Sequence, residues 1–276
     1  MVSPSALFDM PTRLRHRSRA KALGVADFLH REAALQLLDR FEDVNKSFTK
    51  SAFIGWLPEA WHVGFTPDVV APDDEVLALP EAAFDLTVHG LCLHSANDPV
   101  GQLVQMRRAL RPDGLMLAAL FGGQTLHELR FAMAQAETEM EDGLSPRVAP
   151  MGDVRDLGAL IQRAGLALPV ADSSTLTVTY KTPRHLMRDL RAMGETNAMT
   201  ERRKAPLRRA TLLRASQIYV EEFGLPDGRI PATFEIIFLT GWAPSKNQPK
   251  PLKPGSATAR LADALGTVEY KETLDD

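Results

Sequence analysis

The 276-residue chain is long enough for one large domain, or for a core domain with a smaller lobe. Its 45% hydrophobic and 24% charged residues are ordinary for a globular protein, and its formal net charge of -3 argues against a nucleic-acid-binding protein. The single cysteine, Cys92, excludes an internal disulfide framework. No apolar run reaches the roughly 20 residues of a membrane-spanning helix, and no secretory signal opens the sequence.

The N-terminal segment is basic, with four arginines and a lysine and no acidic residue between positions 13 and 21. We expect a solvated arm or first helix; the alternatives are a transit segment or a surface that contacts an acidic partner or a membrane. Residues 22–42 have helical periodicity, and the expected apolar side consists of Phe28, Leu35 and Leu38.

The clearest pattern lies in the middle of the chain. Residues 83–93 form an almost uninterrupted apolar run, which is typical of a strand buried on both faces of a parallel sheet. Residues 97–99, Asn-Asp-Pro, supply a helix start, and residues 112–114, Pro-Asp-Gly, supply its stop. Residues 115–121 then read as a second buried strand, so the whole segment predicts a strand–helix–strand crossover.

The remaining elements extend this pattern. A strand is expected at 47–56, ending at Gly55, and helices and strands then alternate up to a last strand at 233–242. We predict an α/β fold with a doubly wound, mostly parallel Rossmann-like sheet and a helical cap inserted before the last strands. The expected parts are an N-terminal helical arm (1–45), a core (46–182), a helical cap (183–225), a terminal core strand (226–242) and a flexible tail (243–276).

Several motifs carry a family resemblance. Ala78-Leu79-Pro80, Phe84-Asp85-Leu86 and the Leu110–Gly114 segment resemble class I methyltransferases of type 11, which use S-adenosylmethionine. The segments LFGGQTLHELR (120–130), DLRAMGETNA (189–198), PATFEIIFLTGW (231–242) and PGSAT (254–258) are similar to the complex I (NADH:ubiquinone oxidoreductase) assembly factor 5 family and its α-proteobacterial relatives. This resemblance covers about residues 7–258.

The resemblance implies a methyltransferase-like protein that acts on a subunit of respiratory complex I, by arginine modification, or assists its assembly. Two alternatives stay open: a non-enzymatic assembly factor that has lost S-adenosylmethionine binding, and a small-molecule or carrier-protein O-methyltransferase of the kind used in biotin synthesis. Because the family's Leu-Phe-Asp opening already stands at residues 7–9, we expect a bacterial cytoplasmic protein, with peripheral contact at the inner membrane as an option.

The expected cofactor, S-adenosylmethionine, requires a glycine-rich turn after the first strand, because glycine lets the backbone approach the ligand closely. The sequence offers Gly55 alone, followed by Trp56 and by Pro58, which would crowd such a turn. Few residues separate Gly55 from the next candidate strand. We therefore expect the first strand–helix unit to be shortened and its helix to be missing.

The other candidate cofactor residues follow later strands. Glu75 is a candidate for reading the adenine amino group, beside Leu77, and a solvated loop carboxylate is the equal alternative. His94 follows the buried strand and is expected to line the pocket, whereas His89 within the strand is expected to be packed. No metal-ligand spacing is found, and no catalytic residue can be assigned from the sequence.

Overall fold

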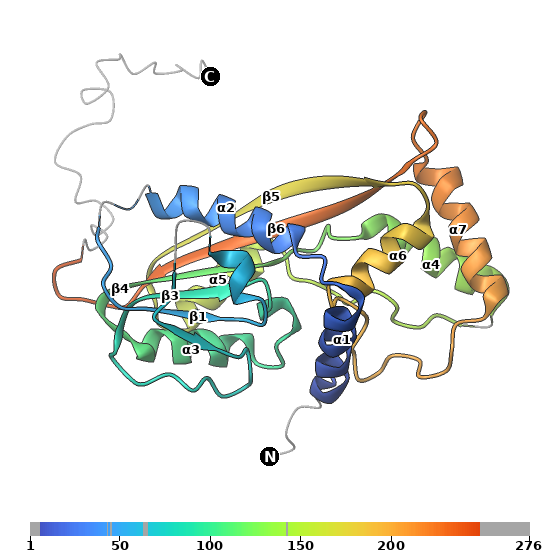
Figure 1. Cartoon of the computed structure of the whole chain (residues 1–276). Coiled ribbons are helices and arrows are strands. Elements are labelled where there is room, and N and C mark those ends of the chain that lie inside the picture. The colour runs from blue at the N-terminus through green and yellow to red at the C-terminus, as the bar shows by residue number, and fades with distance from the viewer. Residues whose placement is uncertain (1–5, 43, 45, 63–65, 142, 249–276) are drawn as a thin grey trace, which may run out of the picture. The chain divides into compact units, whose positions relative to one another are not determined.

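A mixed six-stranded sheet forms the centre of the chain in the computed structural model, which describes residues 6–42, 44, 46–62, 66–141 and 143–248 (Figure 1). The chain divides into two units, Met1–Pro244 and Ser245–Asp276, and the sheet and every named helix belong to the first. Most of the expected tail, including the PGSAT motif, falls in 249–276, outside the described residues.

The sheet has the strand order β2-β1-β3-β4-β6-β5. Its strands are β1 (Ser51–Ile54), β2 (Val69–Ala71), β3 (Phe84–Gly90), β4 (Leu110–Phe121), β5 (Ala167–Tyr180) and β6 (Ile230–Trp242). β1 runs parallel to β2 and β3, β3 runs parallel to β4, and β6 is antiparallel to both β4 and β5. The expected doubly wound α/β sheet is therefore confirmed, and its switch point lies between β1 and β3, where successive connections leave in opposite directions.

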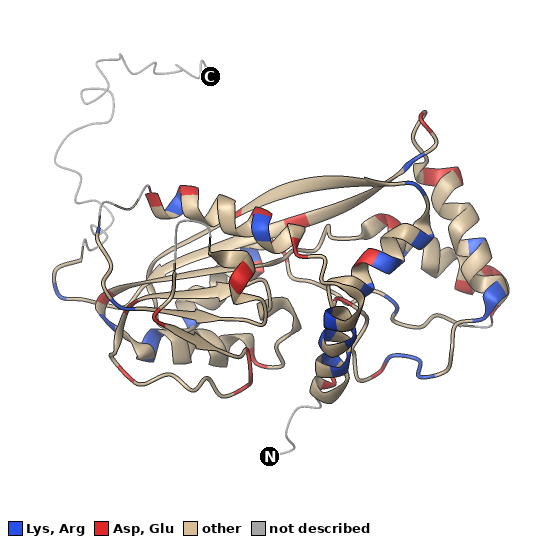
Figure 2. Cartoon of the chain, viewed as in Figure 1, with Lys and Arg blue, Asp and Glu red and all other residues tan. Residues whose placement is uncertain are grey.

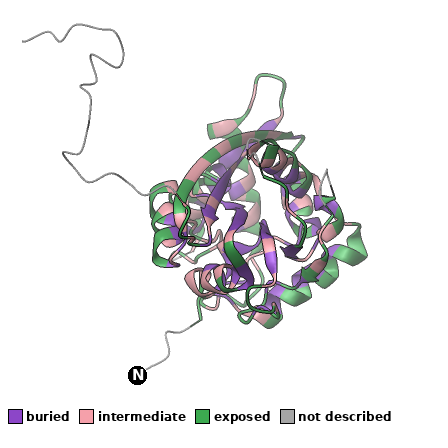
Figure 3. Cartoon of the chain, turned by 90° about the vertical axis from the view of Figure 1, so that its left-hand side faces the viewer, coloured by how far each residue is buried: buried purple, intermediate pink, exposed green. Residues whose placement is uncertain are grey.

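Helices flank the sheet on both sides. They are α1 (Met10–Leu23), α2 (Phe28–Glu42), α3 (Pro99–Ala109), α4 (His127–Met140), α5 (Val154–Arg163), α6 (Pro183–Ala192) and α7 (Arg209–Phe223), with short 3-10 helices η1 (Pro58–Trp61) and η2 (Leu93–Ser95). α4 packs against α7, and α1 packs against α6. Buried residues gather in the central strands, and the outer sides of the helices are exposed (Figure 3).

Two apolar cores lie on opposite faces of the sheet. Along β4, Leu115, Leu117 and Ala119 join the core formed with α2 and α4, whereas Met116 and Ala118 join the core formed with α3 and α5. This alternation follows from the two-residue period of a strand. It explains why the sequence shows an uninterrupted apolar run rather than an alternating one, as expected for strands covered on both faces.

The central crossover forms as predicted except at the helix end: α3 ends at Ala109 and β4 begins at Leu110, so residues 112–114, the expected stop, lie within β4. The Asp98 side chain accepts a hydrogen bond from the Gly101 backbone N–H at 2.7 Å, and Pro99 occupies the first turn of α3. Leu103 and Met106 are fully buried against the sheet. Each such side chain contributes about 1.5–3 kcal/mol by its removal from water.

The N-terminal prediction needs correction. The basic segment forms a helix, which was one of the expected structures. It is not solvated on all sides, because Arg13, His16 and Arg17 are buried. The apolar side predicted for the next helix is wrong at Leu35, which is exposed, whereas Phe28 and Leu38 are half-buried. The fully buried residues of α2 are Leu29, His30, Ala33, Ala34 and Leu37. Figure 2 shows that Lys and Arg are concentrated on α1.

The first crossover is short, as expected. Between β1 and β2 the described residues contain η1 and no α-helix. The sheet accordingly has two strands, β1 and β2, on one side of the switch point, where the six-stranded Rossmann order places three.

Candidate functional site

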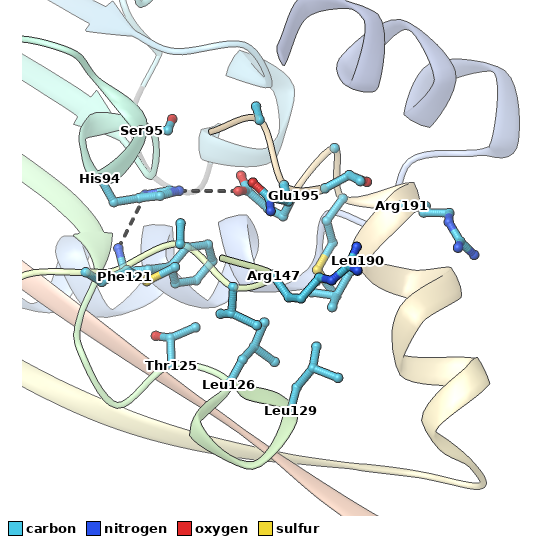
Figure 4. Close-up of a pocket in the computed structure, with 18 of the residues that line it drawn as sticks. His94, Ser95, Phe121, Thr125, Leu126, Leu129, Arg147, Leu190, Arg191 and Glu195 are labelled. Atoms are coloured by element: carbon cyan, nitrogen blue, oxygen red, sulfur yellow. Dashed lines mark hydrogen bonds and ion pairs between the residues drawn. The ribbon is translucent and has the colours of Figure 1, made fainter. Parts of the chain in front are cut away.

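A pocket of about 360 Å³ opens at the carboxyl ends of β3 and β4, next to α6 (Figure 4). Its apolar wall includes Phe121 at the end of β4, Leu126 and Leu129 at the start of α4, and Leu190 of α6. Its polar residues are Arg13, Arg17, His94, Ser95, Thr125, Arg147, Arg191, Glu195, Thr196 and Asn197. A mostly apolar pocket with a few convergent polar groups is the usual form of a ligand site.

His94 reaches the pocket from η2, immediately after β3. Its Nδ1 accepts a hydrogen bond from the Phe121 backbone N–H at 3.5 Å, so the ring carries a proton on Nε2. That Nε2 lies 3.3 Å from the Glu195 carboxylate and donates to it (Figure 4). The imidazole also packs on the Phe121 ring, with centroids 4.8 Å apart. These contacts fix the orientation of His94 from two elements.

Glu195 enters the pocket because α6 ends at a glycine. Gly194 has a φ of +76°, and a Cβ at this position would lie 3.1 Å from the Trp56 ring. The Glu195 backbone N–H donates to the Leu190 carbonyl at 2.9 Å, which closes the helix end and reverses the chain. The side chain of Glu195 keeps 24% of its surface exposed, and it lines the pocket.

The charge of Glu195 is held by its surroundings. Burial raises the pKa of the Glu195 carboxyl, but the interaction with His94 and the positive charge of Arg17 lower it by more, so its pKa lies below the ordinary value. Glu195 is therefore ionised at neutral pH. A carboxylate in a largely apolar pocket is a strong recognition point for a cation.

Two arginines of α1 line the pocket beside this carboxylate. Both Arg13 and Arg17 bind the carboxylate of Asp73, which follows β2 and is 3% exposed. Burial, followed by the charge of Arg17, lowers the pKa of the Arg13 guanidinium. The Arg17 guanidinium also lies 5.2 Å from the centroid of the Trp56 ring. The segment that sequence reasoning described as a solvated arm thus supplies part of the pocket wall.

Two glutamates of α4 stabilise the far wall. Glu128 and Glu137 are buried, at 2% and 0% exposure. Glu137 binds the Arg147 Nε at 2.7 Å, and Glu128 accepts a hydrogen bond from the Thr233 hydroxyl at 2.5 Å.

The four predicted cofactor residues do not come together. His94 lines the pocket as expected, but Gly55 lies at the end of β1, packed on Phe53. Glu75 is exposed and accepts a hydrogen bond from Asn97 at 3.1 Å. Leu77 is buried in the core beside α3, and its backbone N–H donates to Gln105. Their role in cofactor binding stays a prediction.

His89 is packed, as expected, and its Nε2 lies 2.9 Å from the Gln102 Oε1 atom.

S-adenosylmethionine would need free space at the turn after β1, where this fold binds its ligands. The residues present do not fit it there. The rings of Phe53 and Trp61, 0% and 3% exposed, fill the space beside Gly55 and Gly90. Among the described residues, no group of three or more His, Cys, Asp or Glu side chains is arranged to hold a metal ion.

Comparison with known proteins is consistent with this fold. The family described as "Methyltransferase domain" matches residues 55–118. A malonyl-[acyl-carrier protein] O-methyltransferase of Halorhodospira halophila is 36% identical over 64% of this chain and 58% of its own length. The YcgJ protein of Bacillus subtilis superposes with a TM-score of 0.47 at 14% identity, covering 78% of this chain and 99% of that one. The expected resemblance to methyltransferases is confirmed for residues 55–118, which the family model matches.

Other relatives match more of the chain. The mitochondrial arginine-hydroxylase NDUFAF5 of Danio rerio is 35% identical over 93% of this chain and 89% of its own length. The human protein of the same name is 42% identical over 72% of this chain and 57% of its own length. Within the described part of the chain, no helix is long and apolar enough to cross a membrane. On the near-complete match to the Danio rerio protein, the chain belongs to the family of the arginine-hydroxylase NDUFAF5.

Proposed function

We propose that this chain acts on, or assists the assembly of, a subunit of respiratory complex I by holding an arginine side chain of that subunit in the pocket. The observation that carries the proposal is the ionised Glu195 carboxylate in a largely apolar wall. Two further points support it: the family resemblance implies a complex I partner, and the relatives are named arginine-hydroxylases.

The pocket matches both parts of an arginine side chain. The apolar stem would lie against Leu126, Leu129 and Leu190, and the guanidinium would pair with Glu195. Three of the four arginines that line the pocket already pair with carboxylates of the chain, because Arg13 and Arg17 bind Asp73 and Arg147 binds Glu137. They therefore repel an incoming cation less than free arginines would.

When bound, S-adenosylmethionine would supply a methyl group, but the residues at the turn after β1 do not fit it. We place the protein on the cytoplasmic side of a bacterial inner membrane, where complex I is assembled, with peripheral contact as an accompanying proposal.

Recognition of arginine can be tested with a small probe. Calorimetric titration with N-acetyl-arginine amide should show saturable binding, and the citrulline analogue, which keeps the shape and loses the charge, should bind about ten- to a hundredfold more weakly. Glu195→Gln should abolish this difference. The matched control Glu139→Gln, at a carboxylate paired with Arg214 on the surface, should preserve it. Equal affinity for both probes in the unaltered protein would exclude arginine recognition.

The cellular role has a separate test. Deleting the gene should reduce NADH oxidation by complex I in membranes, and the unaltered gene should restore it. A gene encoding Glu195→Gln should fail to restore it, whereas Glu139→Gln should succeed. Normal NADH oxidation in the deletion strain would refute the complex I role.

A further inference from the structure

The ends of β1 and β3 form the place where a doubly wound sheet binds its ligands. β1 and β3 are parallel neighbours, with Ile54 opposite His89, and the chain leaves them toward opposite edges of the sheet. The space outside their carboxyl ends is here called the β1–β3 crevice, bounded by Gly55 after β1 and Gly90 at the end of β3. Glycines at such positions normally allow a nucleotide-like ligand to approach the backbone.

In this chain, aromatic side chains use the room that the two glycines leave. A Cβ on Gly90 would lie 2.4 Å from the Phe53 ring and 2.9 Å from the Trp61 ring. A Cβ on Gly55 would lie 2.9 Å from the Phe53 ring. The two rings are 5.6 Å apart, and the Trp61 Nε1–H donates to His30 at 3.1 Å. The glycines therefore serve internal packing, and the rings are fixed by α2 and η1.

The charged groups near the crevice are also engaged internally. Arg17 binds both oxygens of the Asp73 carboxylate, at 2.6 and 3.0 Å, and Arg13 binds one of them as well. Arg13 donates in addition to the Ser95 carbonyl at 2.8 Å, and Arg17 to the Cys92 sulfur at 3.3 Å. Two buried arginines beside the strand ends are suited to a ligand's carboxylate. Here they hold a carboxylate of the chain itself.

We infer that the β1–β3 crevice is closed to S-adenosylmethionine, with the rings of Phe53 and Trp61 packed against its two glycines and Asp73 as an internal anion on Arg13 and Arg17. The neighbouring pocket stays open to a ligand. This inference does not depend on the complex I role, because it concerns other residues and is tested with another ligand.

The direct test is calorimetric titration of the full chain with S-adenosylhomocysteine and with S-adenosylmethionine. The expected result is no saturable binding tighter than about 1 mM. If binding is seen, Met187→Trp, which narrows the pocket at α6, locates it. Binding that this substitution abolishes lies in the pocket and agrees with a closed crevice. Binding that it leaves intact lies elsewhere and overturns the inference.

The internal anion has its own test. Asp73→Ala should lower the Tm, and sodium acetate should raise the Tm of this variant more than equal sodium chloride does. The unaltered chain and Asp172→Ala, which breaks a partly exposed pair with Arg40, should show no acetate-specific gain. Absence of that gain in Asp73→Ala overturns the assignment. If Asp73→Ala does not fold, Asp73→Asn replaces it, and an unchanged Tm of that variant overturns the assignment.

Discussion

The β1–β3 crevice and the pocket lie side by side at the carboxyl end of one sheet, yet they are built in opposite ways. In the crevice, two glycines are covered by the rings of Phe53 and Trp61. In the pocket, Gly194 turns the chain so that Glu195 faces a cavity of about 360 Å³. Glycine thus allows close packing in one region and open space in the other. A sheet can therefore keep its ligand-binding edge while the place that accepts a ligand moves along it.

The largest expected loss of stability comes from removing an aromatic ring at the β1–β3 crevice. Phe53→Ala should lower the free energy of unfolding by about 3–5 kcal/mol, because a fully buried ring is lost from a filled space. Urea denaturation of both proteins measures this difference. The control Phe131→Ala, at a ring that is 47% exposed, should cost under about 1 kcal/mol. Equal small losses would mean that the crevice is not packed as described.

Acid should lower the free energy of unfolding, because two buried histidines of the chain must take up protons. Burial lowers the pKa of His30 and of His89 from 6.5 to about 4. The unfolded chain therefore binds protons first as the pH falls. Stability present above about pH 6.5 is lost progressively toward pH 4, by up to about 3 kcal/mol for each histidine.

Unfolding free energies measured between pH 7 and pH 4 test this expectation. His89→Gln should reduce the slope by up to about 1.4 kcal/mol per pH unit, because one titrating group is removed. The matched control variant is His185→Gln, at an exposed histidine. A slope that His89→Gln does not alter would contradict a neutral, buried His89.

A smaller effect is expected at the far wall of the pocket. Glu128 is 2% exposed and accepts hydrogen bonds from the hydroxyl and the backbone N–H of Thr233, which tie α4 to β6. Glu128→Gln should lower the free energy of unfolding by about 1–3 kcal/mol. Glu139→Gln on the same helix, at an exposed pair, should cost under about 1 kcal/mol. Similar values for both variants would show that this wall is not stabilised by the buried carboxylate.

The sequence predicts what depends on local patterns and misses what depends on distant partners. The crossover from β3 to β4 follows from an apolar run and the Asp98 cap, which lie close together, although the Pro-Asp-Gly segment lies within β4 and does not end α3. The shortened first crossover follows from the few residues after Gly55. The burial of Arg13 could not be predicted, because its partner Asp73 stands 60 positions away and the local pattern is that of a solvated basic helix.

The site also contains residues that the sequence predicts and residues that it misses. His94 was placed correctly at the pocket, because it follows a buried strand of a parallel sheet and ligands bind at that edge. Glu195 carried no such signal of its own and was noted only within a family motif. Its position depends on the end of α6 and on the packing of Gly194 against Trp56, a contact between segments far apart in the chain.

The smallest effect should come from widening the pocket. Met187 of α6 is half-buried and already faces open space, so Met187→Ala creates little new cavity and should cost under about 1 kcal/mol. Met106→Ala, at a fully buried methionine of the opposite core, should cost about 2–5 kcal/mol under the same urea denaturation. A loss for Met187→Ala as large as that for Met106→Ala would mean that α6 closes over the pocket in solution. The pocket would then be closed in solution, and it would not differ from the packed β1–β3 crevice.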